Sequence, residues 1–174
     1  MRQTLLLLGL VAVSGLAEAE VTDSSELGFT IEHERLVSAS RMEAWRAAVH
    51  EVGQWWSDDH TITGDASRLR IDARPLGCFC ESLGGSAGVV HLTVTFVNPG
   101  VILRLTGGLG PLGLMGVNGN MTWEFNDVDE GTLLRFTYAV GGYRPGGLAD
   151  VAAPVDRVVG EALQRLEAYI DAGG

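Results

Sequence analysis

The sequence contains no lysine, and its 12 cationic residues are all arginines. They are scattered along a chain whose formal net charge is −10 at pH 7. Proteins that bind nucleic-acid backbones or anionic lipid surfaces gather their cations into clusters. The composition therefore excludes a general polyanion-binding surface, and we expect no nucleic-acid partner.

Cysteine is also scarce: Cys78 and Cys80 are the only two, and a single residue separates them. On a strand, residues i and i+2 point the same way with Cα atoms about 7 Å apart, at the limit of what a disulfide spans. This spacing favours two buried thiols, although exported proteins often form disulfides. A metal site would require these thiols to meet His60 or His91, and His91 is expected on the opposite strand face. We predict no metal and no other cofactor.

No apolar run reaches the length of a membrane-spanning helix, roughly 20 residues. Arg2, the apolar run 5–16 and the small residues Ala17 and Ala19 instead form the pattern of a secretory signal peptide. We expect cleavage after Ala19, a periplasmic or secreted mature chain and no stable membrane insertion after cleavage; the alternative is an uncleaved anchor. Residues 1–19 are thus predicted as the signal peptide, and residues 20–174 as one domain.

A strand and two short helices open the predicted domain. Residues 28–37 alternate enough to form a strand. Ser40 and Glu43 have the spacing of a capping box, which begins a helix. The apolar stripe of this helix breaks near Gly53, so a second short helix is expected around Trp55. The stripe consists of apolar residues at spacings of three and four: Trp45, Ala48, Val49, Val52 and Trp56.

The middle of the chain predicts six strands joined by short turns, which indicate an antiparallel sheet. Alternation along the strands gives this sheet one apolar face. It places Val90 and Phe96 on the apolar face, and His33 and His91 on polar faces. Glu81 and His91 are expected as cross-strand neighbours on the outer face. The six ranges are 68–73, 78–83, 89–97, 101–106, 120–125 and 132–140.

A long helix from residue 150 onward is expected to cover the apolar face. The order is then strand, helix, short helix, six strands and long helix (β-α-α-β6-α), which is an α+β fold. The helix carries apolar residues at helical spacing, namely Val151, Val155, Val158, Val159, Ala162, Leu163, Leu166 and Ile170.

This order of elements resembles the helix-grip fold of the START-like (SRPBCC) superfamily, which includes polyketide cyclases and heat-shock-ATPase activator homologues. The resemblance implies a curved antiparallel sheet wrapped around the C-terminal helix, with a mostly apolar cavity between them. The polar residues of aromatising cyclases have no counterparts here, and an exported protein should not keep the cytosolic activator role. The resemblance covers roughly residues 28–172 and rests on Trp55-Trp56, the strand from Gly77 to Glu81, the turn Gly131-Thr132, and the segments 155–157 and 164–166 of the closing helix.

Two motifs resemble catalytic or cofactor-binding signatures, but neither is followed by the helix that such a signature requires. Residues 84–88 satisfy G-x-S-x-G, but a β-branched run follows where a nucleophile elbow needs a helix. Residues 108–113 satisfy G-x-G-x-x-G, but no helix follows to present its amides to a pyrophosphate. We interpret the first as a hairpin loop, and the second as an apolar flap at a cavity rim or as a structural loop. No catalytic residue is predicted.

We expect a binding protein for a hydrophobic or aromatic small molecule, held between the sheet and the C-terminal helix. One alternative is a cyclase- or hydrolase-type enzyme acting on a polyketide- or lipid-like substrate. Another is a protein-interaction module with a closed cavity. His60, shortly after the paired tryptophans, is expected at the cavity mouth. The residues predicted to line the cavity are Trp55, Trp56, His60, Cys78, Cys80, Leu105, Leu112, Met115, Trp123, Phe136, Tyr138, Tyr143, Val159 and Leu163.

Overall fold

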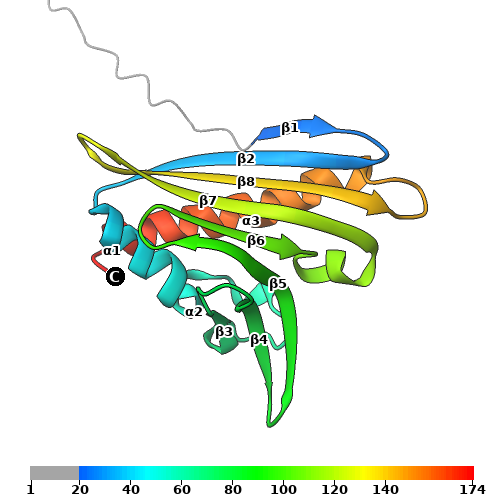
Figure 1. Ribbon diagram of the computed structural model, residues 1–174, viewed down its shortest axis with the longest axis horizontal. Helices are drawn as coiled ribbons and strands as arrows, with labels where there is room; N and C mark the ends of the chain where they lie inside the picture. The colour runs from blue at the N-terminus through cyan, green and yellow to red at the C-terminus, as the bar shows by residue number, and fades with distance from the viewer. Residues whose placement is uncertain (1–19) are drawn as a thin grey trace, which may run out of the picture.

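Residues 20–174, the part of the chain that the computed structural model describes, form an antiparallel sheet with a long helix across one face (Figure 1). The predicted signal peptide lies outside the described residues. The strands are β1 (Glu20–Ser24), β2 (Gly28–Val37), β3 (Leu69–Ile71), β4 (Cys78–Gly84), β5 (Ala87–Asn98), β6 (Ile102–Gly107), β7 (Gly116–Val128) and β8 (Gly131–Tyr143). The helical segments are α1 (Arg41–Trp45), η1 (Arg46–His50), α2 (Val52–Trp55), η2 (Asp58–His60), η3 (Ala66–Arg68), η4 (Gly110–Leu114) and α3 (Ala149–Asp171).

The eight strands lie in the order β1-β2-β8-β7-β6-β5-β4-β3, and every neighbouring pair is antiparallel. The sheet is unclosed, because β1 and β3 form its two edges. Helix α3 crosses the inner face and contacts β2 and β1 (Figure 1). The predicted α+β helix-grip fold is confirmed. Strand β1, which pairs with β2, is the one strand of the described sheet that the sequence did not predict.

The first helical segment begins as predicted. The Ser40 N–H donates to Oε2 of Glu43 at 3.0 Å, and the Ser40 hydroxyl donates to the same oxygen at 2.5 Å. The helix breaks at Glu51, slightly before the break predicted at Gly53. Gly53 lies inside α2, where a Cβ atom would come 2.8 Å from the carbonyl oxygen of Ala66. Glycine at this position therefore allows α2 to pack closely on η3.

On β2, β7 and β8, the alternation of side chains along each strand decides which of them point to the inner face of the sheet. Trp123 on β7 and Phe136 on β8 are buried on the inner face, as their parity predicts. His33 also belongs to this face, because it shares its parity with Phe29 and Ile31 and is only 3% exposed. The expectation that His33 lies on a polar face is therefore wrong.

Strand β5 departs from regular alternation at two bulges. Phe79 pairs with Leu92 while Cys80 pairs with Val90, so His91 is an extra residue on β5. One extra residue shifts the side-chain alternation by one. His91 is consequently buried, the reverse of its expected position, and Val90 is 62% exposed. A second register shift follows Val94 and exposes Phe96 in the same way.

The two cysteines form a disulfide, so the expectation of separate thiols is wrong. Their Cα atoms lie 5.4 Å apart, well within reach of a disulfide and closer than a regular strand allows. The contraction occurs opposite the β5 bulge at His91, where the ladder is irregular. A bulge bends and twists the local strands, which a regular-strand estimate does not include.

Candidate functional site

The main cavity of the described residues has a volume of about 630 Å³ and lies at one end of the inner face. Volumes of roughly 300–1,000 Å³ are typical of small-molecule sites. The N-terminal half of α3, strands β4 and β5, and the loop after His60 form its walls, together with residues 107–116, which we call the flap. The lining residues are Trp56, Asp59, His60, Thr61, Ile62, Leu69, Phe79, Val89, Val90, His91, the segment 108–115, Val151, Pro154, Val155 and Val158.

An unbroken series of aromatic contacts leads from the protein core to the cavity wall. The ring of Trp55 lies 5.6 Å from that of Trp56, which meets Phe79 edge-on at 5.3 Å. Phe79 in turn meets the His91 imidazole at 5.8 Å. Edge-to-face packing of this kind holds rings in defined orientations. The cavity wall is therefore continuous with the packed core.

Tyr138 fixes the base of the flap. Its hydroxyl donates to the carbonyl oxygen of Gly107 at 2.9 Å and accepts from the N–H of Leu109 at 3.1 Å. Burial raises the pKa of Tyr138 to about 12, which keeps this hydroxyl protonated. Further along the flap, Leu112 is buried whereas Leu114 is 93% exposed. The flap is thus anchored at its base and carries an exposed apolar tip.

Glu81 and His91 form a buried pair at the cavity. Nε2 of His91 lies 3.2 Å from Oε2 of Glu81, and the two side chains are 6% and 0% exposed. They lie on adjacent strands, but the residue paired with Glu81 is Val89, and the bulge at His91 turns the imidazole to the inner face. The prediction of an ordinary pair on the outer face is therefore wrong.

The backbone between η2 and η3 holds the Glu81 carboxylate. The N–H of Ile62 donates to Oε2 at 3.0 Å, and the N–H of Thr63 donates to Oε1 at 2.6 Å. Burial by itself favours the neutral acid, but these donors and His91 stabilise the carboxylate more, so the pKa of Glu81 is lowered. Glu81 is consequently an anion at neutral pH, with its orientation set by two backbone amides.

His60 occupies the cavity wall at a more exposed position, near the predicted mouth. Its Nε2 lies 3.3 Å from Oε2 of Glu161 on α3, and both side chains are partly exposed. The carbonyl oxygen of His60 accepts the indole N–H of Trp56 at 3.1 Å. The cavity therefore has two imidazoles on its wall, one exposed and one buried.

The structure brings some of the predicted lining residues to the cavity and leaves others in the core. Trp56, His60, Leu112 and Met115 line it. Seven others are buried in the hydrophobic core and do not line the cavity. These seven are Trp55, Leu105, Trp123, Phe136, Tyr138, Val159 and Leu163.

The three remaining predicted residues lie away from the cavity lining. Cys78 and Cys80 are absent from the cavity lining, although Cys80 is buried. Tyr143, at the end of β8, is 73% exposed. Their placement on the cavity is corrected accordingly. Sequence reasoning missed Phe79 as a lining residue, although its alternation with the cysteines was visible.

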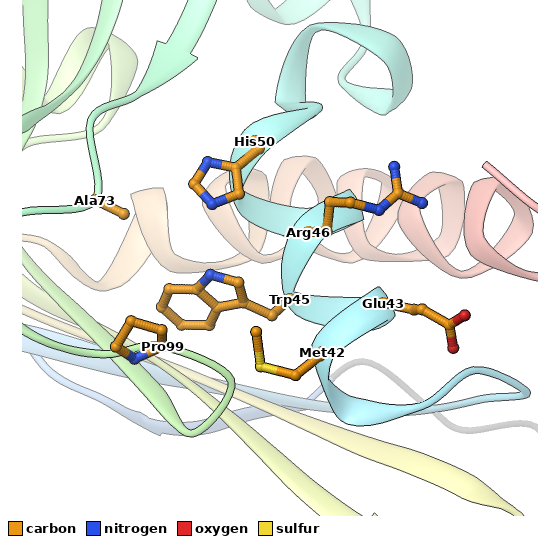
Figure 2. Close-up of a pocket in the computed structure, with 7 residues that line it drawn as sticks. All are labelled: Met42, Glu43, Trp45, Arg46, His50, Ala73 and Pro99. Atoms are coloured by element: carbon orange, nitrogen blue, oxygen red, sulfur yellow. The ribbon is translucent and has the colours of Figure 1, made fainter.

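A second hollow, of about 500 Å³, lies between α1, η1 and the turn after β5 (Figure 2). Figure 2 shows Trp45 and His50 directed toward Pro99 and Ala73, whereas Glu43 and Arg46 point away. Trp45 is itself a core residue, packed edge-on against Phe125 at 5.2 Å. This hollow has no buried charged pair on its wall, in contrast to the main cavity.

Residues 20–174 offer neither a cluster of metal ligands nor a membrane-spanning helix. Within them, no three or more His, Cys, Asp or Glu side chains are grouped so as to hold a metal ion. In the same range, no helix combines the length and the apolar character that crossing a bilayer requires.

Residues 33–171 match the model of a family described as polyketide cyclase / dehydrase and lipid transport. A solved protein from Rhizobium leguminosarum is 20% identical, with a TM-score of 0.61 over 90% of this chain and 99% of that one. CalU16 from Micromonospora echinospora is 17% identical, with a TM-score of 0.51 over 88% of this chain and 83% of that one. DynU16, from the dynemicin biosynthetic locus, is 18% identical, with a TM-score of 0.56 over 83% of this chain and 48% of that one. At such identities these structures establish the fold alone, and no curated protein matches the chain.

Proposed function

Because the chain belongs to the polyketide cyclase / dehydrase and lipid transport family, we propose that it binds an apolar or aromatic small molecule in the main cavity. The observation that carries the proposal is a hollow of about 630 Å³ with a mostly apolar wall and a few polar groups. A small-molecule site has this composition, because apolar surface supplies affinity and a few polar groups orient the ligand. An interaction module with a collapsed cavity fits this hollow less well.

The test is titration with the neutral dye N-phenylnaphthylamine, whose fluorescence rises in apolar surroundings. We expect saturable binding of one dye per chain. Val158 lines the cavity from α3 and is half-buried, so Val158→Trp should fill the space and weaken binding on the order of 10-fold or more. Val128→Trp, at the distant end of β7, is the matched control and should bind as the parent does. Absence of saturable binding, or equal binding by the two variants, would contradict the proposal.

We also propose that the protein is exported. The observation that supports this is the disulfide between Cys78 and Cys80. Stable disulfides belong to oxidising compartments such as the periplasm or the exterior. Cell fractionation followed by mass measurement of the purified protein tests this. Export predicts a chain that starts at Glu20 in the periplasm or medium; a full-length chain in the cytoplasm would contradict it.

A further inference from the structure

The main cavity contains an arrangement that ligand binding alone does not require. Glu81 is a fully buried carboxylate, and its contacts with the Ile62 and Thr63 amides and with His91 occupy both of its oxygens. Burying a carboxylate costs free energy unless hydrogen bonds compensate it. An apolar wall of the same shape would hold an apolar ligand without that cost. Glu81 holds the backbone between η2 and η3, and His91 is the member of the pair that lines the cavity.

The contacts determine which nitrogen of His91 is basic. An ionised carboxylate only accepts hydrogen bonds, so neutral His91 must donate its Nε2 proton to Oε2 of Glu81. The lone pair of the imidazole is then on Nδ1. In the described residues Nδ1 has no hydrogen-bond partner, and His91 lines the cavity. A carboxylate that selects the tautomer and orients the ring is the arrangement by which histidine serves as a base in enzymes.

The position of His91 on β5 also supports a role as a base. His91 is the extra residue of a bulge, and without the extra residue its side chain would point to the outer face. Bulges are frequent next to active sites, where they redirect a side chain. Phe79 packs edge-on against the ring and limits its rotation. The orientation of His91 is therefore set from three sides: by the bulge, by Glu81 and by Phe79.

We propose that His91, oriented by Glu81, is a general base that removes a proton from a carbon next to the carbonyl group of a ligand in the main cavity. The proposal rests on the proposed function, because the ligand must first enter the cavity. A neutral imidazole can deprotonate carbon only where the carbanion is delocalised, as it is beside a carbonyl. The C–H bond breaks, the proton moves to Nδ1, and the electron pair passes to the carbonyl oxygen as an enolate. Return of the proton to carbon regenerates His91, so the step needs no co-reactant. Glu81 is the positioning residue.

The probe is β-tetralone, an apolar bicyclic ketone, in D2O. Exchange of its α protons for deuterium is followed by NMR, and its dissociation constant is measured separately by tryptophan fluorescence. The protein should accelerate exchange above the buffer rate. His91→Gln and Glu81→Gln should each slow exchange of the bound ketone on the order of 100-fold while leaving its affinity unchanged. His50→Gln, at the second hollow, is the matched control and should exchange as the parent does.

Two outcomes separate this inference from the proposed function. If β-tetralone binds but exchanges at the buffer rate, or if His91→Gln exchanges as fast as the parent, the general base is refuted and ligand binding stands. If neither β-tetralone nor the dye binds, the proposed function fails and the inference with it. Should Glu81→Gln not fold, His91→Ala with added imidazole replaces it: partial recovery of exchange supports the inference, and no recovery in a folded variant that still binds the ketone opposes it.

Discussion

The hydroxyl of Tyr138 donates a hydrogen bond to the carbonyl oxygen of Gly107 at 2.9 Å. The same hydroxyl accepts from the N–H of Leu109, so one buried side chain satisfies two backbone groups of the flap. These bonds connect the middle of β8 to the base of the flap. The wall of the main cavity thus depends on a residue that does not line it.

Replacement of this hydroxyl should loosen the flap. Tyr138→Phe leaves the Gly107 carbonyl and the Leu109 N–H without their partner, and we expect a loss of about 1–3 kcal/mol in the free energy of unfolding. Urea denaturation measures the loss, and hydrogen exchange at Leu109 should become faster. Tyr143→Phe, at an exposed position on the same strand, is the control and should change neither. Equal stability of the two variants would show that the flap is held by other contacts.

Because His33 on β2 is buried, we expect the protein to lose folding stability in mild acid. Burial disfavours the charged form of His33 more than Asp156 favours it, Arg35 acts in the same direction as burial, and the pKa is lowered from 6.5. The unfolded chain therefore binds a proton that the folded chain resists, and stability should fall as the pH drops below 6.5. In His33→Leu this part of the pH dependence should disappear from urea midpoints.

The control for this measurement is His50→Gln, which removes a histidine that is exposed on η1. It should keep the full acid dependence of the parent. A flat parent profile below pH 6.5, or the same slope in His33→Leu, would contradict the assignment to His33.

The lowered pKa of Glu81 predicts a second loss of folding stability, at lower pH than the first. Its pKa is lowered from 4.5, so folding favours the carboxylate, and the stability it contributes is present above pH 4.5 and falls below it. Glu81→Gln should lose this acid dependence. It should also cost about 1–3 kcal/mol at neutral pH, because an amide nitrogen cannot accept from the Ile62 or Thr63 N–H. Urea midpoints measured through this range test both statements, and an unchanged acid slope would contradict them.

Reduction of the disulfide should have a small effect. Cys78 and Cys80 are two positions apart, so the bond closes a very short loop and restricts the unfolded chain little. We expect the Cys78→Ser, Cys80→Ser double variant to lose about 1–2 kcal/mol by urea denaturation. Dye binding should be unchanged, because the pair lies outside the main cavity. A large loss of dye affinity would show that the disulfide shapes the cavity wall.

The two buried histidines, His33 and His91, show what alternation within a single strand can and cannot predict. His33 shares its parity with Phe29 and Ile31, so alternation within β2 alone is enough to place it on the inner face. His91 is different, because its position follows from a one-residue bulge. A bulge is a property of the pairing of two strands, and alternation within β5 alone points to the wrong face. The exposure of Phe96 has the same origin.

The sequence by itself determined the order of elements, the antiparallel sheet, the covering helix and most of the inner face. These depend on local signals: the Ser40 capping box, turn residues, and periods of two and of three to four. Tertiary structure decided where the main cavity lies, that Cys78 and Cys80 are bonded, and that His91, paired with Glu81, lines this cavity. Each of these depends on how neighbouring strands register and on how α3, the flap and β5 pack around the cavity, and both are contacts between residues far apart in the chain.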